Sequence, residues 1–211
     1  MMKHILSVML LAAFCLSGQA KDYKLPKPQT KAGMSLLEAL SKRASARAFS
    51  QREIDAKTLS TVLWAACGIN REKEKKITAP SAINAQDILI YVARQDGAFL
   101  YDPRTNTLKQ VTEKDVRPYL AAGQQFVTQA PVSLIMVSDQ SRFGNRSRGA
   151  ADMGKYDAAY VSENICLVCT ALGLNTVPRM MMDTVGLSRE LGLTPQQVPL
   201  LNNPIGWPPA K

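Results

Sequence analysis

The chain has 211 residues, of which 46% are hydrophobic and 20% are charged, and this composition suits one globular domain with its own core. The formal net charge of +9 attracts anions, but no helix-turn-helix or aromatic RNA-binding motif accompanies it, so we expect no nucleic-acid partner. The one histidine, His4, lies in a segment that we expect to be removed, which excludes Ser-His-Asp and Cys-His catalysis and predicts no metal site.

Residues 1–20 have the pattern of a secretory signal peptide. Lys3 precedes an apolar run over residues 5–16, which is too short to cross a bilayer as a helix. The sequence Gly18-Gln19-Ala20 then supplies small residues at the cleavage position. We therefore expect cleavage after Ala20 and an exported protein, periplasmic or secreted, that does not insert into the membrane.

Residues 21–34 are rich in proline and lysine and predict an exposed lead-in to a single domain at residues 35–211. The spacing of apolar residues predicts a first helix from about residue 35 to residue 46. A cluster of basic and hydroxyl residues follows at its end: Lys42, Arg43, Ser45, Arg47 and Ser50. This basic cluster is either a solvated helix end or an anion site, where guanidinium groups and hydroxyls hold a phosphate.

The next residues predict a helix and then three strands. Asp55 is placed to cap a second helix, which Gly68 closes. Residues 69–80 predict a lysine-rich, mobile loop. Residues 88–94 have the β-branched, apolar character of a strand, and turn residues at 102–106 predict a hairpin of two more short strands.

The second half of the chain mixes helices and strands in the same way. Thr112 is expected to cap a further helix, and the apolar run 132–139 predicts a central strand. A long helix is expected over residues 154–172, then a short strand at 176–181 and a helix at 186–191. Together with the hairpin, this order indicates an α+β fold.

Three cysteines remain after removal of the first twenty residues: Cys67, Cys166 and Cys169. An odd number does not describe a disulfide framework. The CxxC spacing of Cys166 and Cys169 is typical of thiol-redox sites, but their surroundings resemble the middle of an apolar helix rather than a helix start. Buried core cysteines are the favoured interpretation, with redox chemistry as the alternative.

Three separated stretches, KRASARAF (residues 42–49), APSAINAQD (79–87) and DAAYVSENICLVCTALGLNTV (157–177), precede a terminal PIGWP. In this order and spacing they resemble the nitroreductase family of flavin enzymes, and most of all its branch of peptide-azoline dehydrogenases. The resemblance covers roughly residues 35–208. It implies a three-layer α+β fold, in which helices flank a central, mostly antiparallel sheet, and a homodimer.

The resemblance also implies that the cofactor is FMN and that the basic cluster binds it. Arg43, Ala44 and Ser45 match the stretch that holds the FMN phosphate, which Arg can engage with two hydrogen bonds. Arg47 matches a cation beside the pyrimidine edge of the isoalloxazine ring, where reduction places negative charge. No catalytic side chain is implied, because the cofactor carries the hydride chemistry.

Further matches complete the implied flavin site. The turn that reaches the flavin from the partner subunit is matched by Pro80, Ser81, Ala82 and Asn84. Gln124 lies near the position that supplies polar contacts to the ring. Arg179 and Met180 correspond to a strand whose backbone amide faces the hydride-accepting nitrogen of the flavin.

This chain departs from the family pattern in three places. Family members often have two adjacent arginines where this chain has Arg43 and Ala44, and they often end in a Lys-x-Arg-like tail. Lys211 is expected to replace part of that tail in the phosphate site. Tyr160 stands where the family tends to have small residues, and it can occlude the ring.

The resemblance implies transfer of hydride or electrons between a donor and a small organic acceptor. NAD(P)H is the donor in the usual family cycle, whereas export favours a membrane quinol or a small reductant. The departures leave a second hypothesis, a flavin-free binding protein that uses the dimer cleft of the same fold for another ligand. A third is a basic surface protein that binds polyanions through the lysine loop at residues 71–76.

Overall fold

A computed structural model of the chain describes residues 21–31, 34–146 and 148–210. The predicted signal peptide and Lys211 therefore lie outside the described residues. The α-helices are α1 (Leu36–Lys42), α2 (Ala56–Cys67), α3 (Arg117–Ala121), α4 (Phe126–Gln129), α5 (Ala150–Leu172) and α6 (Thr184–Glu190). The strands are β1 (Asp22–Lys24), β2 (Ile69–Arg71), β3 (Lys76–Ile77), β4 (Ile88–Arg94), β5 (Gly97–Asp102), β6 (Thr107–Thr112), β7 (Val132–Asp139), β8 (Asn175–Thr176) and β9 (Gln197–Gly206). Short 3-10 helices are η1 (Glu72–Glu74), η2 (Ala82–Asn84) and η3 (Gln140–Arg146).

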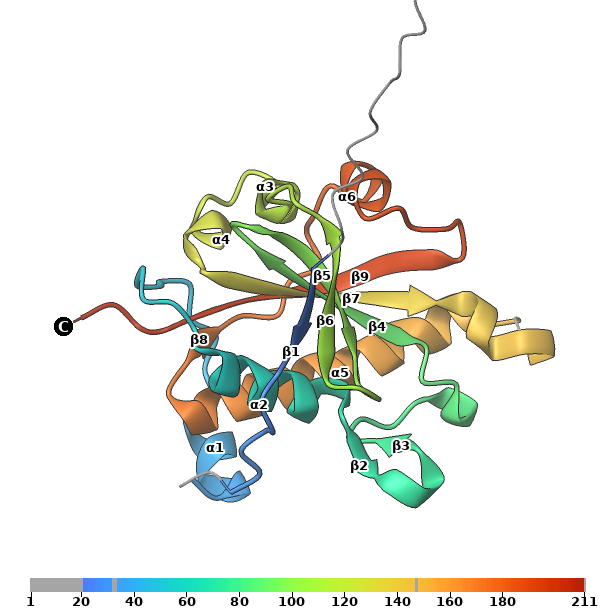
Figure 1. Cartoon of the computed structure of the whole chain (residues 1–211), viewed down its shortest axis with the longest axis horizontal. Helices are drawn as coiled ribbons and strands as arrows, with labels where there is room; N and C mark the ends of the chain where they lie inside the picture. Colours follow the sequence, from blue (N-terminus) through green and yellow to red (C-terminus); the bar gives the residue numbers. More distant parts are fainter. Residues whose placement is uncertain (1–20, 32–33, 147, 211) are drawn as a thin grey trace, which may run out of the picture.

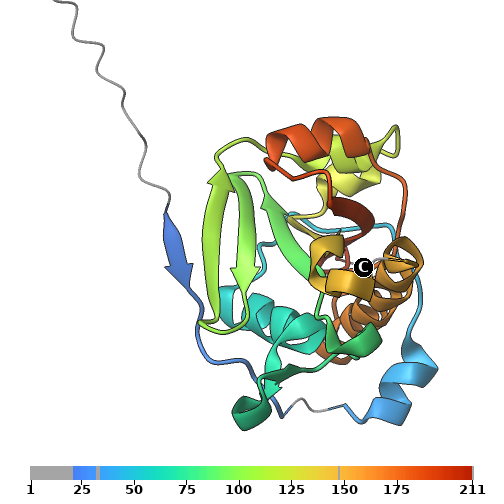
Figure 2. The ribbon, with the colours of Figure 1, turned by 90° about the vertical axis from the view of Figure 1, so that its right-hand side faces the viewer.

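The main sheet has seven strands in the order β1-β6-β5-β4-β7-β9-β8, and every neighbouring pair is antiparallel. Figure 1 shows this sheet as a middle layer, with α1, α2 and α5 below it and α3, α4 and α6 above it. The view turned by 90° in Figure 2 shows the same separation, with β1 at the outer edge. The predicted three-layer α+β fold with an antiparallel sheet is thus confirmed.

Strand β7 explains why helices cover both faces of the sheet. All of its residues except the last are buried, so it is a continuous apolar run with no solvent-facing side. Leu134 and Met136 enter the core shared with α2 and α5. Ile135 and Val137 enter the second core, shared with α3 and α6. The period of two along the strand thus divides its side chains between two cores.

Helix α5 crosses one face of the sheet and begins four residues earlier than predicted, after Gly149 in the left-handed region. It ends as predicted before Gly173, which adopts φ 75°. A Cβ atom at Gly154 would lie 2.3 Å from Ser138 Oγ. The glycine therefore lets the helix approach β7 closely at this point.

Helix α1 is shorter than predicted, because it ends at Lys42 with Arg43 as its C-cap. The residues Ser45 and Arg47 therefore follow the helix rather than belonging to it. The leucines that predict this helix are exposed, with Leu37 at 77%, and Ala39 is its buried residue. Since α1 packs on α5 while these leucines face outward, the apolar face of α1 has no cover within the described chain.

Other elements differ from the prediction. Residues 69–77 form the small β2–η1–β3 hairpin, so the expected mobile loop is wrong. Thr112 ends β6, and the following helix begins only at Arg117. In place of the strand expected at 176–181, the short β8 is followed by an isolated bridge between Arg179 and Asn202.

Both ends of the domain also contribute strands that the sequence pattern did not predict. In the lead-in, β1 pairs with β6, and Leu25 is buried, although most of its neighbours are exposed as expected. Near the C-terminus, β9 pairs with β7 in the interior of the sheet. Within the described ranges, no helix combines the length and apolar character that a membrane span requires.

Candidate functional site

The segment after α1 is fixed beside the end of the sheet. The Ala46 N–H donates to the Thr176 carbonyl oxygen at 3.0 Å, and the Asn175 side chain donates to the Ala48 carbonyl oxygen at 2.8 Å. The Ser50 N–H donates to the Trp207 carbonyl oxygen at 2.8 Å. The basic cluster therefore follows the edge formed by β8 and the end of β9.

The side chains of Arg43, Ser45 and Arg47 are exposed on this segment. Among the described residues, none of these three side chains has a hydrogen-bond or ion-pair partner. The backbone N–H groups of Ala44, Ser45 and Arg47 likewise find no acceptor there. Two guanidinium groups, a hydroxyl and free backbone donors are the groups that bind a phosphate.

Arg179 lies next to this cluster and is used differently. Its side chain is 7% exposed, and its three guanidinium nitrogens donate to Leu120 O, Ala121 O, Asn202 Oδ1 and Gln124 Oε1. Its backbone N–H donates to Asn202 O at 2.9 Å. Burial, together with the charge of Arg47, lowers the pKa of Arg179. The Arg179 side chain therefore positions the surrounding segments, and a contact between this residue and the cofactor stays a prediction.

The residues after Arg179 present an open surface. Met180 is 75% exposed, and its N–H has no acceptor among the described residues. The Gln124 amide, which accepts from Arg179 Nε at 3.0 Å, lies 3.7 Å from Met181 Sδ. The structure thus gathers Arg47, Gln124 and Met180 around the buried Arg179. A flat ligand on this surface would meet thioether side chains and a free backbone donor.

The turn at residues 80–84, which was predicted to reach the flavin, is held by an aspartate of α5. The Ala82 N–H donates to both carboxyl oxygens of Asp157, at 2.9 and 3.0 Å, and Ser81 Oγ accepts from the Gln86 N–H at 2.9 Å. Ile83 has φ 49° and Asn84 has φ 57°. The left-handed region strains a β-branched residue, and such strain persists only where surrounding contacts hold the backbone, as at binding sites.

Asp157 faces a second carboxyl, that of Asp87, beneath the turn. Asp87 Oδ2 accepts from the Ser138 hydroxyl at 2.6 Å, while its Oδ1 finds no protein hydrogen-bond donor among the described residues. Burial, followed by the hydrogen bond and the charge of Asp87, raises the pKa of Asp157 to about 6. A proton held by Asp157 below about pH 6 explains both observations, because it gives Asp87 Oδ1 a donor and removes one of two buried like charges.

Sequence reasoning did not identify Asp157 and Asp87 as parts of the site. The available signal was an acidic residue on an otherwise apolar face of the long helix. Both side chains are nearly inaccessible, at 2% and 0% exposure, and buried carboxylates require a specific partner. Spatial proximity between residues seventy positions apart is not visible in the sequence.

The basic cluster and the turn lie at opposite ends of α5. In Figure 1 residues 43–50 lie near β8 on the left, whereas the turn lies between β3 and β4 on the right. Arg43 is close enough to Cys166 to lower its pKa, against the larger effect of burial, and the turn is bound to Asp157. Nine residues of helix separate these two points, which is roughly 14 Å along the axis. One chain does not bring the two halves of the predicted site together.

Two hollows flank the turn, and both are open. One of about 440 Å³ is lined by the turn together with Tyr156 and Tyr160 of α5, and another of about 420 Å³ is bordered by Arg71 and Lys76 of the β2–β3 hairpin. Tyr160, which was expected beside the flavin ring, thus lies against the turn half of the site.

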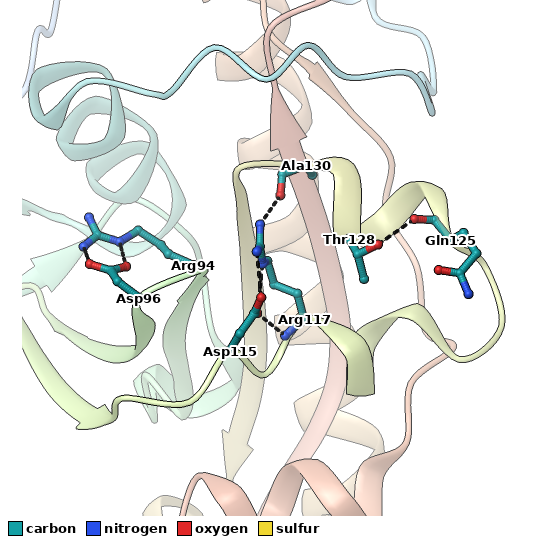
Figure 3. Close-up of polar contacts among 7 residues, drawn as sticks. All are labelled: Arg94, Asp96, Asp115, Arg117, Gln125, Thr128 and Ala130. Carbon is teal, nitrogen blue, oxygen red and sulfur yellow. Dashed lines mark hydrogen bonds and ion pairs between the residues drawn. The ribbon is translucent and has the colours of Figure 1, made fainter.

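A further hollow, of about 460 Å³, contains none of the predicted site residues. Figure 3 shows two arginines of this region, Arg94 and Arg117, each paired with a carboxylate. Arg94 pairs with Asp96, and Arg117 pairs with Asp115 at 2.6 Å and donates to Ala130 O at 3.0 Å. Since both cations are neutralised, this hollow is a weaker anion site than the basic cluster.

The cysteines belong to the core. Cys67, Cys166 and Cys169 are free and buried. Burial raises the pKa of Cys166 to about 11, and it raises that of Cys169 well above its usual range. Because the thiolate is the reactive form, these thiols react only slowly near neutral pH. The interpretation as core residues is confirmed.

Comparison with known proteins gives a consistent result. The nitroreductase family model matches residues 40–207. A Methanocaldococcus jannaschii protein, provisionally named a nitroreductase, is 29% identical over 173 residues, or 76% of this chain and 84% of that protein. A solved structure from Ralstonia eutropha, also provisionally named a nitroreductase, is 32% identical with a TM-score of 0.84 and covers 90% of each chain. A Clostridium acetobutylicum structure, provisionally named an NADH oxidase, shares the fold at 18% identity and a TM-score of 0.60, over 82% of this chain and 89% of its own.

Proposed function

The chain belongs to the nitroreductase family of oxidoreductases, and from this premise we propose that it is an FMN-dependent enzyme whose flavin sites lie between two copies of the chain. The enzyme transfers hydride or electrons between a donor and a small organic acceptor. Bound FMN would supply the hydride-carrying ring, and the protein would bind it, orient it and limit access of water.

The observation that carries this proposal is the basic cluster, with its exposed and unpartnered donors. Arg43 and Ser45 would hold the FMN phosphate, and Arg47 would lie near the edge of the ring that gains negative charge on reduction. The free N–H of Met180 would face the ring from the neighbouring segment. These groups fit the cofactor because each offers a donor that no described protein atom uses.

The position of the turn supports a site shared by two chains. Pro80, Ser81, Ala82 and Asn84 lie roughly 14 Å along α5 from the basic cluster of their own chain, so the two halves form separate surfaces of one chain. Between the two halves, exposed apolar side chains gather on α1 and α5, including Leu37, Tyr156 and Tyr160. An isologous dimer that buries this surface would bring the turn of each chain toward the cluster of the other.

NAD(P)H is the donor that the family resemblance favours, and small organic molecules are the acceptors. Export, which rests on residues 1–20, would instead favour a quinol or another small reductant. Membership of the azoline-dehydrogenase branch stays a prediction from the sequence motifs.

FMN titration of the purified chain tests this proposal. Each of the substitutions Arg43→Ala and Arg47→Ala should weaken FMN binding roughly tenfold to a hundredfold, because each removes a charged hydrogen bond worth about 1.5–3 kcal/mol. Quenching of flavin fluorescence measures the dissociation constant. Lys57→Ala, which removes an exposed charge of the same sign from α2, is the matched control and should leave the constant unchanged.

Two results would count against the proposal. One is a colourless protein that takes up no FMN at high micromolar concentration, and it would favour the flavin-free binding protein. The other is equal weakening by all three substitutions, which would indicate general electrostatic attraction rather than a built site.

A further inference from the structure

Strands β4 and β5 part at one end of the sheet. Their pairing stops where Tyr91 lies opposite Leu100. Beyond that point β4 extends back to Ile88, where it pairs with β7, and β5 extends to Asp102, where it pairs with β6. A cavity of about 340 Å³ lies at this opening. Its volume falls at the lower end of the range for sites that bind small organic ligands.

Aliphatic side chains form the floor of this cavity, beside polar residues at its rim. Five aliphatic residues line it: Ile77, Ile88, Leu89, Ile90 and Leu100. The thiol of Cys67, which is 4% exposed, lies among them. Burial raises the pKa of Cys67 to about 12, so the thiol stays neutral. The floor therefore offers hydrophobic contact to the body of a ligand.

The rim of the cavity is positively charged. Arg104, Lys109 and Arg142 line it, with Asp102 as the one carboxylate among the lining residues. Lys109 pairs with Asp102 at 3.1 Å, and Arg142 lies 3.6 Å from a carboxyl oxygen of Asp139. Within the described chain, the Arg104 guanidinium has neither a hydrogen-bond nor an ion-pair partner. An uncompensated cation remains at the mouth of a hollow whose floor is aliphatic.

This charge balance distinguishes the cavity from the larger hollow that Arg94 and Arg117 line. There, Arg94 and Arg117 each have a close carboxylate partner. Here, an anion entering from solvent would gain a charged partner without displacing a carboxylate from Arg104. Low-dielectric walls strengthen that attraction.

We propose that the cavity between β4 and β5 is a second ligand site, separate from the cofactor site, for a small organic carboxylate with an apolar body. The carboxylate is bound at the rim by Arg104 with support from Lys109. The apolar body lies against Ile77, Ile88 and the Cys67 thiol, which share one core. This inference does not depend on flavin binding.

Octanoate and its neutral counterpart octanamide are the probes, titrated calorimetrically into the full chain. We expect octanoate to bind and octanamide to bind about tenfold or more weakly, since the amide forms no ion pair. Arg104→Gln should weaken octanoate binding by about tenfold or more, and Arg104→Lys should restore part of it. Arg189→Gln, at an exposed arginine of α6, is the matched control and should change nothing.

Cys67 reports where the probe binds. Octanoate should slow alkylation of Cys67 by a maleimide, followed by mass spectrometry, and leave the rate at Cys166 unchanged in the same sample. The proposal is overturned if octanoate does not bind at millimolar concentration, if the two probes bind equally, or if Arg104→Gln leaves binding unchanged. Protection of Cys166 as strongly as Cys67 would also overturn it, because it would indicate a general change in stability.

Discussion

At the scale of single residues, Arg47 and Arg179 have the same charge but different roles. Arg179 is buried, and its donors are used by carbonyl and amide oxygens of three neighbouring segments. Arg47 is exposed beside it and has no such partners among the described residues. Because a buried guanidinium needs its hydrogen bonds to offset desolvation, the guanidinium of Arg179 is not available to a ligand, whereas that of Arg47 is.

The cost of burying a charge also makes the free energy of unfolding depend on pH at the Asp157–Asp87 pair. The folded-state pKa of Asp157 is raised to about 6 from an unfolded value near 4. The folded chain therefore binds more protons than the unfolded chain between these values, and the free energy of unfolding falls as pH rises through this window. Above pH 6 this destabilisation is complete, at roughly 1–3 kcal/mol.

Asp157→Asn should remove this loss of stability. The amide oxygen still accepts from the Ala82 N–H, and the new N–H₂ group donates to Asp87 without a second negative charge. We expect the variant to be roughly 1–3 kcal/mol more stable than the natural chain at pH 8 and similar to it at pH 4. Urea unfolding at the two pH values measures the difference.

Asp152→Asn is the control, since Asp152 is an exposed acid on the same helix, paired with Lys155. Its effect should stay within about 0.5 kcal/mol at both pH values. If Asp157→Asn is instead less stable than the natural chain at pH 8, the fold does not raise the pKa of Asp157.

The residue types in the sequence predict that the proposed site binds an anion. They do not predict which of these residues stay exposed to a ligand and which are buried against protein groups. Arg43, Ser45 and Arg47 stand out in the sequence because cations and hydroxyls cluster there, and the structure leaves them exposed. Arg179 and Asp157 do not stand out, because burial and partners from distant segments decide their roles.

At the scale of elements, periodicity predicts the strongly patterned segments and fails for those with polar interiors. The apolar run of β7 identifies a central strand. Strand β9 is as central, but it contains Asn202 and Asn203, whose side chains bond to residues 179–181, Thr176 and Ser162. These buried amides satisfy groups of neighbouring segments, which a count of apolar residues does not reveal.

Helix α1 has an apolar pattern, but its leucines do not pack into a core of the described chain. Its leucines are exposed in the single chain, and we attribute this to the proposed partner surface. Leu37→Glu should therefore abolish the dimer, because it places a charge in an apolar interface, while the stability of the separate chain stays nearly unchanged. Size-exclusion chromatography with light scattering measures the mass.

Val185 offers a matched control for this substitution. It is 78% exposed, close to the 77% of Leu37, but it lies on α6 at the other face of the sheet. Val185→Glu should leave the dimer intact. A Leu37→Glu chain that keeps the dimeric mass would show that α1 is not part of the interface.

At the scale of the whole molecule, α5 separates the two halves of the proposed binding site. The basic cluster lies near one end of this helix, and the turn bound to Asp157 lies near the other. The order of these segments in the sequence does not indicate how far apart the basic cluster and the turn lie in the fold. The fold was predictable because three motifs stand in register, and the same resemblance implied a site shared by two chains. The geometry supports that prediction, because one chain keeps the cluster and the turn apart along α5.

A mixed dimer tests this central claim most directly. One chain carries Arg43→Ala and Arg47→Ala, which remove the cluster, and the other carries Pro80→Glu, which places a negative charge on the exposed turn. Each altered chain alone should form dimers that bind FMN weakly at both sites. In the mixed dimer, one site joins the two altered halves and the other joins the two natural halves.

The quantity to measure is the number of FMN molecules bound per mixed dimer, isolated with two different affinity tags. The shared-site account predicts about one FMN per mixed dimer, bound with the affinity of the natural protein. A mixed dimer that binds no more FMN than its two parents would contradict the account, because it would show that each flavin site is built within a single chain.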